Sequence, residues 1–266
     1  MIRTKFDSTA DIASYKSIWE KYEPGNRYII IDNFFENVDL LHEAHQEFYQ
    51  IPIEYWEFSD QHPTQYLKRT YPNMFLPKNL STIFEYIQST AFISTLSSIT
   101  GLKDLIPDLG LYGAGLHVTS STGFLGTHVD RPYDAEKNRY RRLNFLLYMN
   151  PVWKTEWNGE LEIYDKNCSR ILESVQPIFN RLVLLETPLT PHGHAKPLTT
   201  PDNIERLSIA SYYYTHEPPR VIANQLQSNR AEWKFQHEAK THMPCMEDMY
   251  KQIQNSYDRA KERVLG

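Results

Sequence analysis

The middle of the chain shows short apolar runs separated by turn-forming residues. Several of these runs alternate apolar with polar residues, as strands with one buried face do. Their spacing of roughly 10–20 residues, with long loops, is typical of a sandwich, barrel or jelly roll and not of repeated βαβ units. The runs that predict strands between residues 105 and 215 are LYGAGLHV, GFLGTHV, RLNFLLYM, GELEIYD, RLVLLE and ERLSIASYYYT.

The segments on either side of this block have helical patterns. Apolar residues recur three and four positions apart there, and Ser, Asn or Asp stands where a helix would begin. The elements expected in the first hundred residues are a helix that begins near Ser8 or Asp11, a strand over Arg27–Asp32, a helix over Asn37–Tyr49, and one or two helices over Leu80–Thr100 that end at Gly101. Later in the chain, two charged amphipathic stretches, Asn229–His242 and Met246–Val264, predict helices packed along the sheet. An interface or a lid is the alternative for these two stretches.

This order of elements predicts one domain, mainly β with flanking α, over residues 1–266. The block 105–215 is its core, residues 1–104 form a helical or mixed support, and residues 216–266 form a helical extension. A chain of this length can bury a sizeable core.

Composition narrows the class of protein. The net charge of -5 gives no electrostatic case for a nucleic-acid partner, which would call for a basic patch. No run approaches the ~18 apolar residues of a membrane span, and the first residues have no apolar segment of signal-peptide length. Two cysteines exclude a disulfide scaffold and a cysteine-based zinc module. We therefore expect a cytoplasmic protein without a membrane partner.

Glycine is scarce, yet it is concentrated in one part of the chain. Of the 10 glycines, six lie between residues 101 and 126: Gly101, Gly110, Gly113, Gly115, Gly123 and Gly126. We expect tight turns between strands there, together with a close approach of the backbone to a binding pocket.

The segment HVD, directly after these glycines, is a candidate metal site. On an extended strand, His128 and Asp130 point to one side. A second histidine from a distant strand would complete a set of two histidines and one carboxylate, which holds Fe(II) and leaves coordination positions open. His192, in PHGH after the apolar run RLVLLE, is the candidate for that ligand. By itself HVD is a weak signal, because a chain with 10 histidines produces such a triplet by chance.

A candidate anion site lies on the last strand of the block. Arg206 and Ser208 share one face of that strand. A guanidinium beside a hydroxyl is suited to clamping a carboxylate, and an inward-facing arginine is costly unless it is paired. Tyr148 is on a strand expected to run beside this site.

The order of HVD, YMN, WNGEL, PHG and R-x-S resembles the Fe(II)/2-oxoglutarate-dependent dioxygenases, closest to their prolyl-4-hydroxylase-like branch. The resemblance implies a double-stranded β-helix, or jelly roll, that uses Fe(II), 2-oxoglutarate and O2. It implies that His128, Asp130 and His192 are the iron ligands, with His194 as the competing choice for the last of them. It implies further that Arg206, Ser208 and Tyr148 bind 2-oxoglutarate and, by a looser match, that His117 contacts it.

The same resemblance implies a reaction but not a substrate. Because the carboxylate Asp130 is present, we expect hydroxylation rather than halogenation, with desaturation and cyclisation left open. The expected substrate is a small molecule, such as an amino acid or a biosynthetic intermediate. Candidate substrate contacts are Arg131, Arg69 or Lys68, Trp153 and His194, with Trp56, Tyr66 and Tyr71 as further pocket aromatics.

Two other functions stay open at this point. One is hydroxylation of a prolyl or other residue within a protein. The other is a jelly-roll protein that binds a metal or ligand without turnover, including a cupin, although the first His-x-His pair of a cupin is absent. A homodimer formed through the C-terminal helices is a further expectation.

Overall fold

The computed structural model describes residues 2–58, 64–73, 75–219, 232–233 and 246–266. Its helices begin and end close to the predicted positions, because capping side chains mark their first turns. Ser8, Asn37 and Ser89 each accept a backbone N–H from the first turn of a helix, and Gly101 ends one in the left-handed conformation. The α-helices are α1 (Thr9–Glu20), α2 (Val38–Glu47), α3 (Lys78–Ile87), α4 (Thr90–Thr100) and α5 (Met246–Leu265), and the 3-10 turns are Lys5–Asp7, Ile53–Tyr55 and Thr155–Trp157.

The strands form one curled, antiparallel sheet. Its main path runs β1-β10-β7-β12-β5-β11-β8-β9, while β3 adds to β5 from the other side. The strands of the described residues are β1 (Tyr28–Ile31), β2 (Glu57–Phe58), β3 (Gln65–Tyr71), β4 (Ile106–Pro107), β5 (Gly115–Val129), β6 (Tyr133–Asp134), β7 (Arg139–Tyr148), β8 (Leu161–Tyr164), β9 (Ile171–Val175), β10 (Leu182–Glu186), β11 (His192–His194), β12 (Arg206–Thr215) and β13 (Glu232–Trp233). The predicted mainly-β fold with flanking helices is confirmed.

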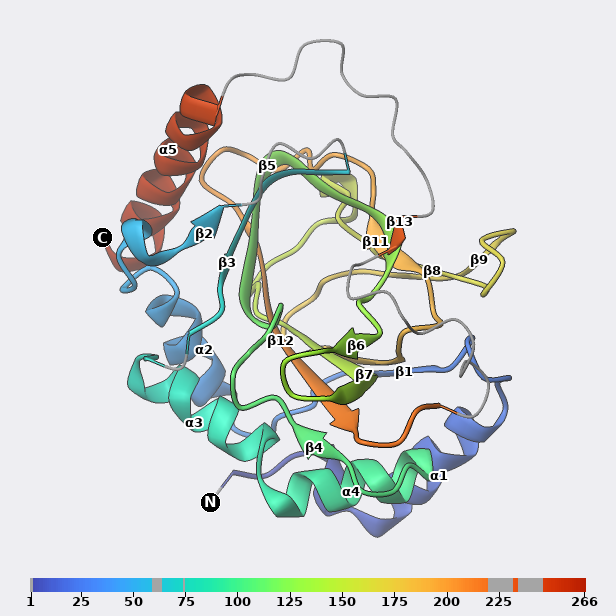
Figure 1. The fold of residues 1–266 in the computed structure, drawn as a ribbon. Helices are drawn as coiled ribbons and strands as arrows, with labels where there is room; N and C mark the ends of the chain where they lie inside the picture. Colours follow the sequence, from blue (N-terminus) through green and yellow to red (C-terminus); the bar gives the residue numbers. More distant parts are fainter. Residues whose placement is uncertain (1, 59–63, 74, 220–231, 234–245) are drawn as a thin grey trace.

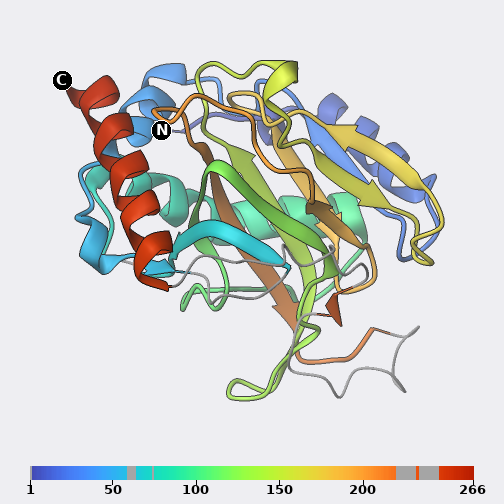
Figure 2. The same cartoon turned by 90° about the horizontal axis from the view of Figure 1, so that it is seen from above.

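The helices gather along one side of this sheet (Figures 1 and 2), and the buried side chains of its two faces belong to two different clusters. Strand β7 shows the division, since Phe145 and Leu147 pack into the large core with the helices, whereas Leu146 and Tyr148 belong to a smaller cluster. This is the alternation expected of a strand with two different faces. Within the described residues, no helix is long and apolar enough to cross a membrane.

The C-terminal region bears out one of the two helices predicted there. The stretch Met246–Leu265 forms α5, which packs against β3 and β5 and buries Met249, Ile253 and Tyr257 in the core of its own chain. The helix predicted over Asn229–His242 is wrong at Glu232–Trp233, which pair with β5 as a strand. The rest of that stretch lies outside the described residues.

Two strand predictions need correction. The runs LYGAGLHV and GFLGTHV, expected as separate strands, contribute to one long strand, β5. Of the clustered glycines, Gly101, Gly110 and Gly113 lie at a helix end or in turns, whereas Gly115, Gly123 and Gly126 let the chain at β3 and just before it approach β5. A Cβ atom at Gly115 would overlap the carbonyl oxygen of Tyr71, and at Gly123 it would lie 2.8 Å from that of Tyr66. Both contacts involve backbone, which cannot move aside as a side-chain end can.

Candidate functional site

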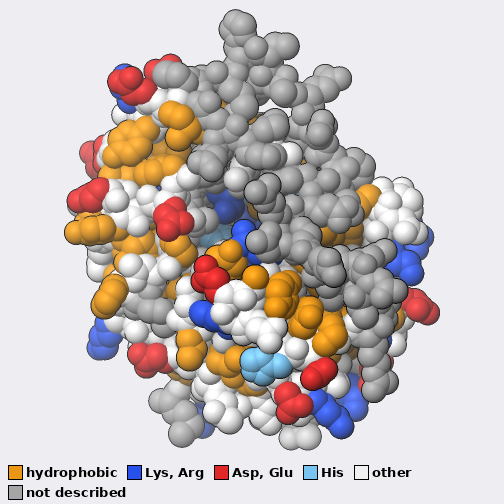
Figure 3. Space-filling model, viewed as in Figure 1, with side chains coloured by type: hydrophobic (Ala, Val, Ile, Leu, Met, Phe, Trp, Pro, Cys, Tyr) orange, Lys and Arg blue, Asp and Glu red, His pale blue; other side chains and the backbone are white. Residues whose placement is uncertain are grey.

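A cavity of about 520 Å³ opens on the side of the sheet that the helices leave uncovered. Residues of β3, β5, β7, β8, β11 and β12 line it. Figure 3 shows it as a hollow near the centre of this face, with Lys or Arg and His side chains in its depth. Proteins generally bind small molecules in concave sites where a few polar groups converge.

Three predicted metal ligands meet in this cavity. The register of β5 and β11 places His192 opposite His128, and their ring centroids are 4.8 Å apart. The two carboxylate oxygens of Asp130 lie 3.7 Å from Nε2 of His128 and from Nε2 of His192, respectively. Ligand atoms of all three residues lie within 4.8 Å of one another, which is true of no other such group in the described part of the chain. Since metal–ligand bonds are about 2.0–2.2 Å long, a single ion fits between them.

The hydrogen bonds of the two histidines point their second nitrogens at this position. Nδ1 of His128 lies 2.9 Å from the carbonyl oxygen of Gly126, and Nδ1 of His192 lies 2.9 Å from that of Thr190. A carbonyl oxygen only accepts, so each Nδ1 carries the proton and each Nε2 has the lone pair. Burial also lowers the pKa of His192, which keeps its imidazole neutral. These residues therefore fit a divalent metal ion.

Asp130 is held as a charged carboxylate in a fixed orientation. Burial would raise its pKa, but the neighbouring imidazoles of His192 and His128 and the guanidinium of Arg141 hold that pKa well below its usual range. Asn144 donates to one oxygen at 2.9 Å, and the hydroxyl of Tyr212 donates to the other at 3.1 Å. Partners of this kind around a metal ligand fix its orientation and raise metal affinity.

The predicted carboxylate clamp lies in the same cavity. Arg206 donates to the carbonyl of Gly159 at 2.8 Å and to the hydroxyl oxygen of Tyr148 at 3.3 Å. Burial raises the pKa of Tyr148, so its hydroxyl keeps the proton and can donate it to a ligand. Ser208 is in register with Tyr148 on one side and with His117 on the other, and all of them line the cavity.

The structure brings some of the predicted substrate contacts into the cavity and leaves others out. Arg131, Lys68 and His194 line it, and the Arg131 guanidinium lies 4.4 Å from the ring centroid of Tyr112. Arg69 does not line it, because its guanidinium makes two hydrogen bonds of 2.7 Å to Glu205 within the core. Trp153 lies outside as well and donates to the carbonyl of Asn158. The aromatic residues Trp56, Tyr66 and Tyr71 are core residues beyond the cavity wall.

Several cavity residues were not predicted from the sequence. Asn144 and Tyr212, which hold Asp130, and Thr119, on β5 beside Arg206, are examples. A signal for Asn144 was present, since it lies four residues before Tyr148 on one strand and so shares its face. No local signal marks Tyr212, because its strand is aromatic on both faces.

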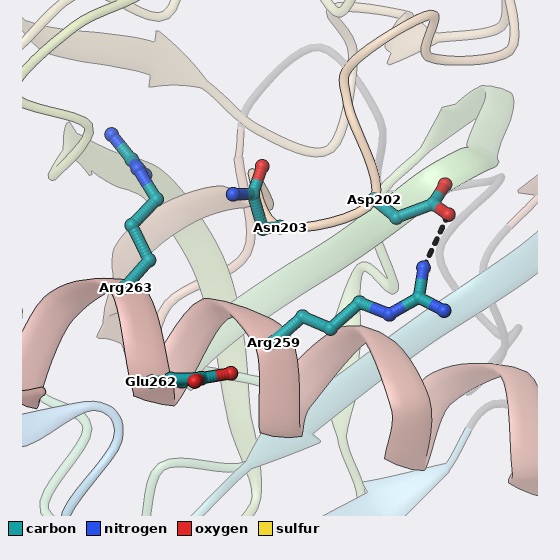
Figure 4. Close-up of a pocket in the computed structure, with 5 residues that line it drawn as sticks. All are labelled: Asp202, Asn203, Arg259, Glu262 and Arg263. Atoms are coloured by element: carbon teal, nitrogen blue, oxygen red, sulfur yellow. Dashed lines mark hydrogen bonds and ion pairs between the residues drawn. The ribbon is translucent and has the colours of Figure 1, made fainter.

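A second hollow, of about 410 Å³, lies between the loop at Asp202 and helix α5 (Figure 4). Its lining side chains are Asp202, Asn203, Arg259, Glu262 and Arg263, and Arg259 is already paired with Asp202. It contains no histidine and no cysteine, so it offers no comparable set of ligands or nucleophiles.

Fold and site together define the class of protein. A curled antiparallel sheet that presents two histidines and one carboxylate to a buried cavity is the arrangement of a mononuclear non-haem iron oxygenase. Residues 114–214 match the model of the 2OG-Fe(II) oxygenase superfamily. The prolyl 3-hydroxylase OGFOD1 of Mus musculus is 26% identical over 196 residues, which are 70% of this chain and 32% of that protein.

Solved structures share the fold. A prolyl hydroxylase of Trichoplax adhaerens, in complex with a hypoxia inducible factor peptide, has a TM-score of 0.57 and 18% identity over 79% of this chain and 94% of its own. The epimerase SnoN of nogalamycin biosynthesis, which is non-haem and α-ketoglutarate dependent, has a TM-score of 0.54 and 12% identity over 81% and 88% of the two chains. The same fold thus occurs in proteins with very different substrates.

The match over residues 114–214 and the prolyl hydroxylase relative both support the resemblance to the 2OG-Fe(II) oxygenases of the prolyl-4-hydroxylase-like branch. The family predicted from the motifs is confirmed, and Fe(II), 2-oxoglutarate and O2 are the cofactors of that family. The chain spans about a third of the length of the curated relative that it matches.

Proposed function

We propose that the protein is an Fe(II)- and 2-oxoglutarate-dependent oxygenase that hydroxylates an unactivated C–H bond and releases succinate and CO2. The observation that carries the proposal is the presence of two complementary sets of residues in one buried cavity. His128, Asp130 and His192 offer three metal ligands, and Arg206 with Tyr148 offers a cation and a hydroxyl for a carboxylate.

The residues of the chain position and shield the reactants. His128, Asp130 and His192 would hold Fe(II), which together with 2-oxoglutarate and O2 supplies the oxidising chemistry when bound. Arg206, Tyr148 and Ser208 would hold the far carboxylate of 2-oxoglutarate. Burial of all these groups keeps bulk water from the reacting centre and strengthens their electrostatic interactions.

For the substrate we propose a small molecule such as an amino acid or a biosynthetic intermediate. Arg131 supports this assignment, because it follows the ligand Asp130 directly, lines the cavity and has no ion pair among the described residues. Its guanidinium is placed to receive a carboxylate of a substrate whose reacting carbon faces the metal. His194, which also lines the cavity, is the other predicted substrate contact.

A prolyl residue in a protein is the second candidate. It is favoured by the curated relative, which is a prolyl 3-hydroxylase and aligns with 70% of this chain. The two candidates differ in the form of the substrate, free or within a peptide, and not in the chemistry at the metal.

A panel of free amino acids and proline-containing peptides, incubated with the protein, Fe(II) and 2-oxoglutarate in air, distinguishes them. We expect a product heavier by one oxygen from a free amino acid or related metabolite. Product only from peptides would contradict the small-molecule proposal, and loss of two hydrogens would indicate desaturation or cyclisation. The His128→Ala variant should give no product, whereas His216→Ala, an exposed histidine, should match the wild type.

Two further expectations stay predictions: a cytoplasmic location and a homodimer through the C-terminal helices. For the homodimer, the apolar stripe of α5 is already buried in its own chain, so any dimer would use its exposed face.

A further inference from the structure

The cavity contains a buried cation that the roles above do not use. Lys68 on β3 is only 8% exposed and lines the cavity. Its ammonium group makes no hydrogen bond and no ion pair with any described residue. Arg206, the other cation in this part of the cavity, also has no carboxylate at ion-pair distance among the described residues; its partners are a carbonyl and a phenol.

The neighbouring residue, Arg69, is a buried cation whose contacts stabilise the fold. Arg69 is 1% exposed, and Glu205 neutralises it with two hydrogen bonds of 2.7 Å. Burying a charge without such a partner destabilises the fold. Lys68 is held at this cost, and burial together with the charge of Arg206 lowers its pKa to about 8.

The sheet places Lys68 and Arg206 on either side of the same residue. Both are in register with Thr119 of β5, Lys68 from β3 and Arg206 from β12. Since neighbouring strands lie about 4.8 Å apart, their backbones are about 10 Å apart and their side chains converge over Thr119. A bulge in β3 at Leu67, with φ of 47°, shifts the register there and aims Lys68 into the cavity.

His194 completes this corner of the cavity. Its Nε2 lies 3.4 Å from the hydroxyl of Thr119, and its Nδ1 is buried without a partner among the described residues. His194 therefore adds a polar group to this corner of the cavity.

We propose that Lys68 and Arg206 bind the far carboxylate of 2-oxoglutarate from two sides, so that the cosubstrate site of this chain has two cations. The inference rests on the proposed function, because it requires 2-oxoglutarate as the ligand. We assign the far carboxylate of 2-oxoglutarate to Lys68 because Lys68 and Arg206 are in register with the same residue of β5. The metal ligands His128 and His192 pair with each other elsewhere on β5. A carboxylate of the substrate is the alternative ligand for these two cations.

The test compares two ligands on two proteins. Wild type and Lys68→Met, loaded with Fe(II) without oxygen, are titrated by calorimetry with 2-oxoglutarate and with 2-oxopentanoate. The second ligand has the same five-carbon chain without the far carboxylate. We expect the substitution to weaken 2-oxoglutarate binding about ten- to hundredfold and to leave 2-oxopentanoate binding unchanged. Lys68→Arg should recover most of the affinity, and Lys103→Met, an exposed lysine, should match the wild type.

Three results would overturn the proposal. Unchanged 2-oxoglutarate affinity in Lys68→Met would show that Lys68 does not contribute to 2-oxoglutarate binding. A raised KM for the substrate in the same variant would show that Lys68 binds a carboxylate of the substrate instead. An equal loss for both ligands would indicate a general disturbance of the cavity. If the wild type itself bound no 2-oxoglutarate, the proposed function would fail, which separates that failure from a failure of the Lys68 assignment alone.

Discussion

At the scale of residues, buried charges in this chain fall into two groups. Some are paired within the protein, such as Arg69 with Glu205 and Arg139 with Asp108, each at 2.7 Å. Others, such as Lys68 and Arg206, have no carboxylate partner among the described residues and face the cavity. The first group stabilises the fold, and the second is available to a ligand.

The paired group gives a prediction for pH dependence. Burial would raise the pKa of Glu205, but the charge and hydrogen bonds of Arg69 outweigh it and lower that pKa below its ordinary 4.5. The unfolded chain therefore takes up this proton first as the pH falls. The stability from the pair is complete above about pH 4.5 and is lost as the pH falls through the lower, folded-state pKa.

Glu205→Gln leaves Arg69 buried without its counter-charge. We expect it to lower the free energy of unfolding by about 3–5 kcal/mol at pH 7, measured by urea denaturation. The difference in free energy of unfolding between Glu205→Gln and the wild type should narrow below pH 4.5. Glu156→Gln, at an exposed glutamate whose side chain is 70% accessible, should change stability by less than about 0.5 kcal/mol. A gap for Glu205→Gln that stays constant or widens on acidification would contradict this account of the pair.

The sequence predicts residue chemistry better than residue partners. The spacing of His128 and Asp130, and the order of the motifs, were sufficient to indicate which candidate metal ligands meet in the cavity. Arg69 was a reasonable substrate contact by type, but its partner Glu205 is 136 positions away. Only the folded register of β3, β5 and β12 brings the two together, so the sequence could not separate Arg69 from its neighbour Lys68.

At the scale of elements, periodicity predicts the helices well and the strands less well. The N-terminal helices α1, α2 and α4 each begin at a side-chain cap as well as having apolar residues at helical spacing, so two independent signals agree there, whereas α3 begins after Pro77 without such a cap. Strand β3, QYLKRTY, was not predicted because its charged residues point into the cavity or into a buried ion pair instead of into solvent. This strand therefore lacks the alternation of apolar and polar residues from which strands are recognised.

The contact between β3 and β5 depends on glycine, which gives a prediction at this scale. Gly115 has φ of +101°, and a Cβ atom there would overlap the carbonyl of Tyr71. We expect Gly115→Ala to lower the free energy of unfolding by about 2–4 kcal/mol, from overlap plus backbone strain.

Gly101→Ala is the matched control for this substitution. Gly101 also has a positive φ, of +72°, but nothing lies within 4 Å of a Cβ atom there. Strain alone should cost about 1 kcal/mol. Equal losses of stability in the two variants, measured by thermal or urea unfolding, would show that the approach of β3 does not constrain Gly115.

At the scale of the whole molecule, one apolar core joins the N-terminal helices, the sheet and α5. It runs from Phe6 through Phe92 and Phe145 to Tyr257, although these residues lie far apart along the chain. This continuity supports the expected single domain over residues 1–266, which stays a prediction. The candidate metal ligands come from strands of the sheet that are distant in sequence. We therefore expect a substitution that disturbs the packing of the core to disturb the site as well.

The central claim is that this scaffold turns over 2-oxoglutarate, and succinate formation tests it most directly. The purified protein is incubated in air with Fe(II) and 2-oxoglutarate, with and without the substrate panel, and succinate is quantified. We predict succinate that depends on Fe(II), rises with the correct substrate, and is absent in the Asp130→Ala and His192→Ala variants. Folded wild-type protein that forms no succinate under any of these conditions would contradict the account and would favour a binding protein without turnover.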